Sequence, residues 1–364
     1  MKKSPDTMVF LHICDYSAPY KGNFIKSLES LETIENVKNI YLFPHRAKAN
    51  KSVEWINALN ENETIAYIQE ENIIKTIFLL KRILKEHKVT HIFRHFYDIK
   101  IDAILKIVCY NKPVVRFCHG MYADKNATGI MHKVRNFLWG KDFLIGVSEA
   151  VSESYRHNFN NVNIHTVDNA IFFDRLNVVD EFQKQDKVSL MCMGYNIKTK
   201  GTDIAIAMAQ KLHENYDFVL NIVVAANDEE LEKYLKSVFV TIPEWINVLP
   251  PVENIATYFN ANDIFLSPSR SEAFGYAVVE AAYCKNSIVA SKTGGQGQLK
   301  IDGVYWFESE NLDDFYVKTE LAVKELNSGE KNLQKENAAK SVQNAYSLDE
   351  WRNAVINLVL NKLR

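Results

Sequence analysis

Cysteine is scarce in this chain of 364 residues, and its placement excludes two common structural devices. The chain has five cysteines, none of which belongs to a C-x-x-C pair, so neither a zinc knuckle nor a disulfide framework is indicated. This usage is typical of a reducing compartment. The chain also lacks a D-x-D sequence suited to a metal-bridged diphosphate, and we therefore expect no obligatory divalent metal ion. The cysteines are Cys14, Cys109, Cys118, Cys192 and Cys284.

Long apolar runs and an excess of charge of one sign are also missing. No stretch approaches the roughly 20 apolar residues that span a bilayer. The apolar run from Met8 to Cys14 is short and contains His12, unlike a signal peptide. The formal net charge of -2 argues against a surface built to neutralise nucleic acid. We expect a cytoplasmic protein with no nucleic-acid partner, and its oligomeric state stays open.

What the sequence does contain is an alternation of short apolar runs with helical patterns. This rhythm indicates βαβ units and parallel sheets. At 364 residues with 47% hydrophobic residues, the chain is long enough for two domains. The expected strands are Val9 to Cys14, Ile40 to Phe43, His91 to Phe96, Val114 to Cys118, Leu144 to Val147, Val188 to Met193, Phe218 to Ala225, Asn247 to Leu249, Ile264 to Ser267 and Ser287 to Ala290.

A polar, charged stretch separates the two series of strands. We place a linker at Val179 to Lys187, and the predicted domains are 1–175 and 176–346. A final segment, 347–364, begins with a capping box from Ser347 to Glu350 and continues with apolar residues at helical spacing. The sequence therefore predicts two doubly wound α/β domains and a last helix with a face to bury.

The segment from Ile264 to Ser291 is the most informative for chemistry. It is predicted to form a buried strand, a loop, a helix and a second buried strand. A helix that starts at Phe274, Gly275 or Tyr276 presents backbone amides and a positive dipole end to a phosphate. Glu280 lies inside that helix in an apolar run, so its carboxylate needs hydrogen-bond donors. The hydroxyls of a ribose could supply them, and an ion-paired or edge-exposed glutamate is an equal alternative.

Glu272 adds a second carboxylate on the other side of the predicted helix start. The run Glu272-Ala-Phe-Gly-Tyr-Ala-Val-Val-Glu280 resembles the E-x7-E motif of retaining GT-B glycosyltransferases, the glycosyltransferase family 4 type. Flanking residues look similar too, namely Asp263, Pro268, Ser269 and Ala281. The resemblance implies that Glu272 contacts the donor sugar and Glu280 the ribose.

A second similarity lies between Met193 and Ile206. In the family, a glycine-arginine pair ends a strand and a lysine-glycine pair opens a helix. Gly194, Lys200 and Gly201 fit this pattern, but Tyr195 stands where the family has arginine. The resemblance implies that Lys200 offsets charge on the leaving diphosphate, with Gly194 and Tyr195 beside it. In isolation, Lys200 would be a solvated turn lysine, and Lys198 or Arg270 could replace the missing arginine.

Two candidates lie in the amino-terminal half. His119 follows the strand Val114 to Cys118, where open α/β sheets place functional groups, although a single histidine there is often structural. The resemblance implies that it faces the donor sugar. Gly22 is the one glycine in a loop where the family commonly has adjacent glycines near the diphosphate, and an ordinary turn explains it equally well.

Two further segments have less specific patterns. Val252 and Ile255 follow a proline pair and resemble the family segment that holds the nucleobase, although proline pairs also simply end strands. The stretch from Ile130 to Lys141 mixes apolar and basic residues. It predicts either a helix packed on its own domain or peripheral contact with an anionic membrane, at its inner face.

As a whole, the resemblance implies a GT-B fold, two Rossmann-like domains facing a central cleft, with the last helix crossing back to the first domain. It implies a metal-independent, retaining transfer of a hexose from a nucleotide diphosphate sugar, with UDP favoured, to a hydroxyl of a glycan, lipid-linked or protein acceptor. Bacterial-type surface polysaccharide or glycoconjugate synthesis is the expected setting. The alternatives are a UDP-sugar 2-epimerase and a catalytically silent partner that binds sugar nucleotides, with which Tyr195 is most compatible.

Overall fold

The structure is a computed structural model, and its chain divides into two compact units. Unit 1 comprises Met1–Ala170 with Leu348–Arg364, and unit 2 comprises Ile171–Ser347. The described residues are 7–18, 21–49, 52–61, 64–96, 98–109, 112, 114–122, 129–139, 142–159, 162–177, 187–224, 229–328 and 332–362. The predicted linker at Val179 to Lys187 lies outside them except for its last residue.

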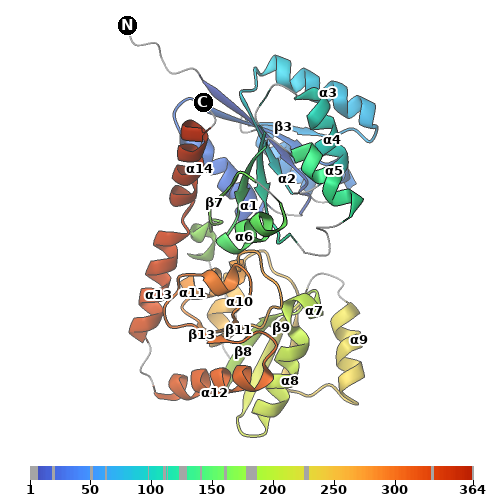
Figure 1. The fold of residues 1–364 in the computed structure, drawn as a ribbon. Coiled ribbons are helices and arrows are strands. Elements are labelled where there is room, and N and C mark those ends of the chain that lie inside the picture. Colours follow the sequence, from blue (N-terminus) through green and yellow to red (C-terminus); the bar gives the residue numbers. More distant parts are fainter. Residues whose placement is uncertain are drawn as a thin grey trace. The chain divides into compact units, whose positions relative to one another are not determined.

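Unit 1 is built on a parallel sheet of seven strands in the order β3-β2-β1-β4-β5-β6-β7 (Figure 1). Every pairing in the sheet is parallel, and the strand order reverses between β1 and β4. Such a reversal leaves a crevice at the carboxyl ends of the two strands. The strands are β1 (Met8–Cys14), β2 (Val37–Phe43), β3 (Ile65–Ile68), β4 (His91–His95), β5 (Val114–Cys118), β6 (Phe143–Gly146) and β7 (Ile164–Thr166).

The helices of unit 1 lie in the connections between these strands. They are α1 (Gly22–Ser30), α2 (Ser52–Glu61), α3 (Ile73–Glu86), α4 (Ile99–Val108), α5 (Ile130–Trp139) and α6 (Glu149–Asn158). The last helix of the chain, α14 (Leu348–Lys362), also belongs to this unit and lies beside α1 (Figure 1). Its residues Trp351, Val355 and Val359 are buried in the same core cluster as Ile25 and Leu28 of α1. Burial of this apolar face holds α14 on unit 1.

Unit 2 has a parallel sheet of six strands in the order β10-β9-β8-β11-β12-β13. All of its pairings are parallel, and here the order reverses between β8 and β11. The loops that follow these two strands therefore meet at one edge of the sheet. The strands are β8 (Val188–Met193), β9 (Phe218–Val223), β10 (Ile246–Leu249), β11 (Ile264–Ser267), β12 (Ser287–Ser291) and β13 (Tyr305–Phe307).

The sheet of unit 2 is covered by helices on both faces, and two separate core clusters result. The helices are α7 (Ile197–Lys200), α8 (Thr202–His213), α9 (Glu229–Val238), α10 (Ala256–Ala261), α11 (Tyr276–Tyr283), α12 (Leu312–Ser328) and α13 (Asn332–Ala345), with a 3₁₀ turn at Phe173–Asn177. The strands predicted in both halves are present in the structure. The predicted α/β class with two doubly wound domains is confirmed.

Helix α5 occupies the stretch for which membrane contact was considered. Leu138 and Trp139 are buried against unit 1, whereas Ile130 and Phe137 are 77% and 71% exposed. Among the helices of the described ranges, none has both the length and the apolar character needed to cross a membrane. Peripheral membrane contact stays a prediction.

Candidate functional site

The loops after β8 and β11 are brought together by a glycine. Gly201 lies between α7 and α8 with a φ of 71°, a conformation that glycine adopts without the cost a Cβ imposes. A Cβ at this position would overlap the carbonyl oxygen of Pro268, the residue after β11. Gly194 is similarly confined, because a Cβ there would lie 2.6 Å from Cγ2 of Ile222. Gly201 thus allows the close backbone approach of the two loops, whereas Gly194 leaves room for the Ile222 side chain.

Lys200, at the end of α7, forms an ion pair with Glu272 in the loop after β11. Its Nζ donates to Oε1 of Glu272, and the Oγ of Ser269 donates to the same oxygen at 3.2 Å. The ammonium also lies 5.3 Å from the centroid of the Tyr195 ring. Burial lowers the pKa of Lys200, but Tyr195 and Glu272 more than offset this, so its pKa is raised. Lys200 is a partly buried, charged group, not a solvated turn lysine.

The start of α11 is shaped by a glycine, and phosphate binding there stays a prediction. Gly275 precedes the helix with a φ of 102°, and its Cβ position lies 3.2 Å from Cβ of Gln296. Tyr276 is the first residue of the helix and is partly buried. Phe274 is only 2% exposed and packs edge-on against Tyr346. The side chain of Phe274 therefore belongs to the core, and only its backbone could serve a ligand.

The loop at 294–297, which was not predicted from the sequence, contacts the backbone of Glu272. A Cβ at Gly294, whose φ is 46°, would overlap the carbonyl oxygen of Glu272, and Gly295 donates its N–H to that oxygen at 2.8 Å. The fully buried Gln296 binds Ser267 through its side-chain oxygen at 2.6 Å and the carbonyl of Ser291 through its amide at 2.9 Å. These bonds fix the position of the Glu272 backbone. The glycine-rich run at 294–297 is the feature of the sequence that could have indicated this loop.

Glu280 is 5% exposed inside α11 and is paired with an arginine. Oε1 of Glu280 accepts from the guanidinium of Arg175, which lies in the 3₁₀ turn Phe173–Asn177. A buried carboxylate without a donor would be costly, and Arg175 supplies one. The ion-paired alternative for Glu280 is therefore what the structure shows. Contact with a ribose stays a prediction, and Arg175 was missed because its partner is 105 residues away.

The phenol of Tyr195 is influenced by charged residues of both ion pairs. Burial raises the pKa of its phenol; Lys200 opposes this, and the carboxylates of Glu272 and Glu280 add to it. All three charged side chains therefore act on one phenol at the edge of the sheet where the strand order reverses. Lys200 thus lies between Tyr195 and Glu272, and the charge of Glu280 acts on the same phenol.

The two cations considered as substitutes for the missing arginine are already engaged. Arg270 donates to Asp203 at 2.8 Å and to Glu310 at 2.8 Å. Lys198 donates to the same Asp203 at 2.6 Å, and its side chain is 76% exposed. Both side chains are engaged in these pairs, and a role for either in place of the arginine stays a prediction.

The remaining candidates lie at separate places. Val252 and Ile255 stand just before α10 and pack partly buried against the same core cluster as Tyr276. Gly22 belongs to unit 1, where it is the first residue of α1 with a φ of 59°. The positive φ explains why glycine stands there, and a role in ligand binding stays a prediction.

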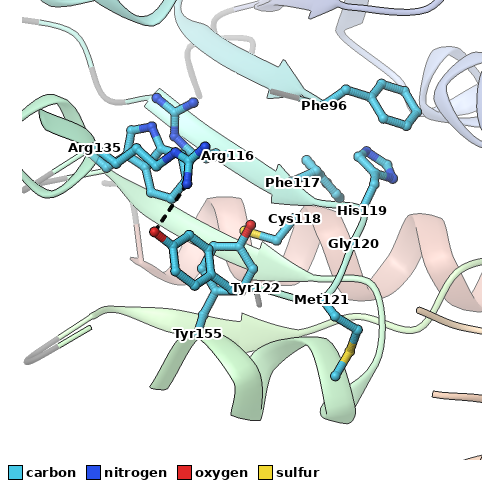
Figure 2. Close-up of a pocket in the computed structure, with 11 residues that line it drawn as sticks. Phe96, Arg116, Phe117, Cys118, His119, Gly120, Met121, Tyr122, Arg135 and Tyr155 are labelled. Carbon is cyan, nitrogen blue, oxygen red and sulfur yellow. Dashed lines mark hydrogen bonds between the residues drawn. The ribbon is translucent and has the colours of Figure 1, made fainter. Parts of the chain in front are cut away.

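His119 lines a cavity in unit 1 at the carboxyl end of β5 (Figure 2). The cavity has a volume of about 330 Å³, and its wall contains aromatic side chains, among them Phe96, Tyr122 and Tyr155. The ring of His119 stacks on Phe96 at a centroid distance of 4.2 Å. This aromatic pocket surrounds a histidine at the place where open α/β sheets bind ligands.

Two arginines line the same cavity. Arg116 donates to Asp102 at 2.8 Å and to Asp142 at 2.7 Å, so its charge is compensated within the fold. Arg135 donates to the hydroxyl of Tyr122 at 3.2 Å (Figure 2). The wall of the cavity is thus largely aromatic, and its polar side chains include Arg135, His119, Tyr122 and Tyr155.

Comparison with known proteins finds a family model that matches most of unit 2. Residues 175–341 match the model described as Glycosyl transferases group 1. An uncharacterised glycosyltransferase of Haemophilus influenzae is 24% identical over 220 residues, which cover 58% of this chain and 60% of that protein. The chain thus spans less than two thirds of the length of this relative.

Solved structures extend the likeness to nearly the whole chain. A glycosyltransferase from Rickettsia africae has a TM-score of 0.80 at 15% identity, with 98% of this chain and 99% of that chain covered. Anabaena HepE in complex with UDP has a TM-score of 0.77 at 13% identity, with 97% and 99% covered. These likenesses show that the chain has the two-domain GT-B fold, and residues 175–341 match the glycosyl transferases group 1 model.

Proposed function

We propose that this chain is a retaining glycosyltransferase that moves a hexose from a UDP-sugar to a hydroxyl acceptor, in the synthesis of a surface polysaccharide or glycoconjugate. The observation that carries the proposal is the gathering of Lys200, Glu272 and Glu280 around Tyr195 in unit 2. HepE, one of the structural neighbours, was solved with UDP and with UDP-glucose, which supports a uridine nucleotide as donor.

The two ion pairs suit the two charged parts of such a donor. A diphosphate is a stronger partner for the ammonium of Lys200 than one carboxylate, so its binding would release Glu272 toward the sugar. Backbone amides at the start of α11, near Gly275, would meet the phosphate oxygens. Glu280 keeps one oxygen on Arg175 and has further acceptor sites for the ribose hydroxyls.

In the proposed reaction the bond between the anomeric carbon and the phosphate oxygen breaks while the acceptor oxygen bonds to the same carbon from the same face. The proton of the acceptor hydroxyl passes to the departing phosphate oxygen, so charge and atoms balance. Lys200 offsets the charge that develops on the leaving diphosphate. Glu272 and His119 hydrogen bond to hydroxyls of the donor sugar. Protein cations supply the compensation, and we propose that no divalent metal is required.

A second candidate is a catalytically silent partner that binds sugar nucleotides. Tyr195 favours it, because the family carries an arginine there and both Lys198 and Arg270 are engaged with Asp203. The complete set of Lys200, Glu272 and Glu280 favours activity. A UDP-sugar 2-epimerase is separated from both by its product, since it isomerises the sugar and needs no acceptor.

The proposal is tested by incubating the full chain with UDP-glucose, UDP-galactose, UDP-N-acetylglucosamine and GDP-mannose, each with and without a mixture of hydroxyl acceptors. Release of the nucleoside diphosphate with a product of retained anomeric configuration supports a retaining transferase. Binding of a nucleotide without turnover supports the silent partner, and an isomerised sugar nucleotide supports the epimerase. No binding and no turnover with every donor would overturn the proposal.

A further inference from the structure

Three histidines of unit 1 form a hydrogen-bonded chain that ends at the cavity. Nδ1 of His12 lies 3.1 Å from Nε2 of His95, and Nδ1 of His95 lies 3.4 Å from Nε2 of His119. At the inner end, Nε2 of His12 lies 3.1 Å from Oδ1 of Asn39. These residues come from β1, β2, β4 and the loop after β5, which are neighbours in the sheet. A connected path therefore runs from the core to the wall of the cavity.

The direction of every hydrogen bond in this chain follows from Asn39. Its side-chain NH₂ donates to the carbonyl of Leu28 at 2.8 Å and to the hydroxyl of Tyr41 at 3.2 Å. A carbonyl can only accept, so the other amide atom, Oδ1, must face His12 and must accept from it. His12 therefore carries its proton on Nε2, which makes its Nδ1 an acceptor.

The tautomers of the other two histidines follow in turn, outward along the chain. An accepting Nδ1 on His12 requires a proton on Nε2 of His95, which makes Nδ1 of His95 an acceptor. Nε2 of His119 must then donate to it. The ring nitrogen left over is Nδ1 of His119, which carries a lone pair and has no hydrogen-bond partner within the part of the chain that the structure describes.

Burial keeps all three imidazoles neutral, as these tautomers require. It lowers the pKa of His12 to about 4 and that of His119 to about 3, and it holds the pKa of His95 well below its ordinary value. Each ring is also held in place by an aromatic neighbour at a centroid distance of 4.2 to 5.0 Å: His12 by Phe93, His95 by Phe117 and His119 by Phe96. The chain is therefore rigid as well as uncharged.

We propose that Asn39, His12 and His95 are positioning residues that fix the tautomer of His119, so that its Nδ1 presents a hydrogen-bond acceptor to a hydroxyl of the substrate. This inference rests on the proposed function for the identity of that substrate. Its consequence is a preference for neutral hydroxyl groups at this position, because a carboxylate or phosphate oxygen would meet a lone pair. The buried side chain of Asn39, which is connected to His119 through three hydrogen bonds, thereby determines which ligand groups His119 can bind.

Two substitutions of His95 distinguish this role from packing. The glutamine side chain in H95Q can accept from His119 and donate to His12, but it cannot stack on Phe117 as a ring does. H95F keeps the ring and its stacking but breaks both hydrogen bonds. We expect H95F to lower kcat/KM for the donor about 10-fold or more, which is the size of one lost hydrogen bond to a buried group, and H95Q to keep most of it. The matched control is H213F in unit 2, whose histidine stacks on Trp245 outside the site.

The tautomers themselves are measured independently of turnover, by long-range proton–nitrogen NMR of the full chain labelled in histidine, with H119Q used for assignment. Wild type should show His12, His95 and His119 all protonated on Nε2, and H95F should change the His119 signals more than H95Q does. A proton on Nδ1 of His119 in wild type would overturn the inference, as would an H95F variant that is active beside an inactive H95Q. If the tautomers are as predicted but neither wild type nor any variant has transferase activity, the proposed function fails and the assignment of the histidine chain stands.

Discussion

The polar groups of the two units differ in their charge. In unit 2 the candidate site consists of full charges, namely the pairs Lys200–Glu272 and Arg175–Glu280. In unit 1 the cavity wall holds His119, a neutral imidazole that ends a chain of neutral imidazoles, together with the guanidinium of Arg135. The charged residue Arg116 is present in unit 1 too, but Asp102 and Asp142 compensate it within the fold.

This difference indicates which part of a substrate each unit recognises. Exchangeable ion pairs suit a ligand that brings its own negative charge, because a diphosphate can replace one carboxylate as the partner of Lys200. A neutral acceptor nitrogen in an aromatic pocket suits an uncharged hydroxyl. Under the proposed function, unit 2 would recognise the nucleotide and the cavity of unit 1 a sugar hydroxyl, and each assignment can be tested separately.

The largest effect is expected from Lys200→Ala. Loss of its ammonium removes the compensation for the leaving diphosphate, and we expect kcat to fall by about 10²- to 10³-fold. Steady-state turnover of the preferred donor measures it. Lys198→Ala is the control, since the side chain of Lys198 is 76% exposed and pairs with Asp203, not with Glu272. Equal losses of kcat in the two variants would show that Lys200 does not specifically stabilise the leaving diphosphate.

Glu280→Gln should act mainly on binding. A hydrogen bond from a ribose hydroxyl to a charged acceptor is worth about 1.5–3 kcal/mol, so we expect KM for the donor to rise about 10- to 100-fold. Because this contact exists in both the ground state and the transition state, kcat should change far less. The matched control is Glu310→Gln, which breaks the exposed pair with Arg270. A lower kcat with an unchanged KM would contradict the ribose assignment.

Acid should destabilise unit 1 through its neutral histidines. The pKa of His12 is about 4 in the folded chain and 6.5 in its reference state, so the unfolded chain binds a proton first as pH falls. Stability is therefore complete above about pH 6.5 and decreases by about 1.4 kcal/mol per pH unit down to about pH 4 for this residue. His12→Gln keeps both hydrogen bonds without titrating. Urea unfolding across this range should show a shallower pH slope in H12Q, and identical slopes would refute the prediction.

The smallest effect is expected from removal of metal ions. If protein cations alone compensate the diphosphate, turnover in excess EDTA should equal turnover with added Mg²⁺ or Mn²⁺. An assay of the same enzyme preparation under the three conditions measures this. Activity that disappears with EDTA and returns with one metal would show that the charged site of unit 2 is incomplete without an ion.

The strands were predictable where the chain is apolar and buried on both faces. The central strands of both sheets were found because parallel strands read as continuous apolar runs. The edge strands β3, β7 and β13 were not found; they have three or four residues each and are only partly buried. In α3, Ile73 and Ile74 fit the apolar pattern, yet they are 49% and 59% exposed and the buried face is formed by Leu80 and Ile83.

The site was predictable where local backbone geometry shapes it. Gly201 and Gly275 stand at positions with positive φ, which glycine adopts without the cost that a Cβ imposes. Residues that become neighbours only in the folded chain leave no such local pattern in the sequence. Arg175 meets Glu280 across 105 residues, and His12 meets His95 across 83. No local pattern encodes a pairing at that separation, because the sheet topology alone decides which residues become neighbours.

The measurement that tests the central claim most directly is calorimetric titration of UDP into the full chain and into its Lys200→Ala and Glu280→Gln variants. Wild type should bind UDP with an affinity that weakens as salt is raised, and each variant should bind at least about 10-fold more weakly, as the loss of one charge-assisted contact predicts. If wild type bound neither UDP nor any other nucleoside diphosphate, or if both variants bound UDP as tightly as wild type, the charged groups of unit 2 would not be the nucleotide site.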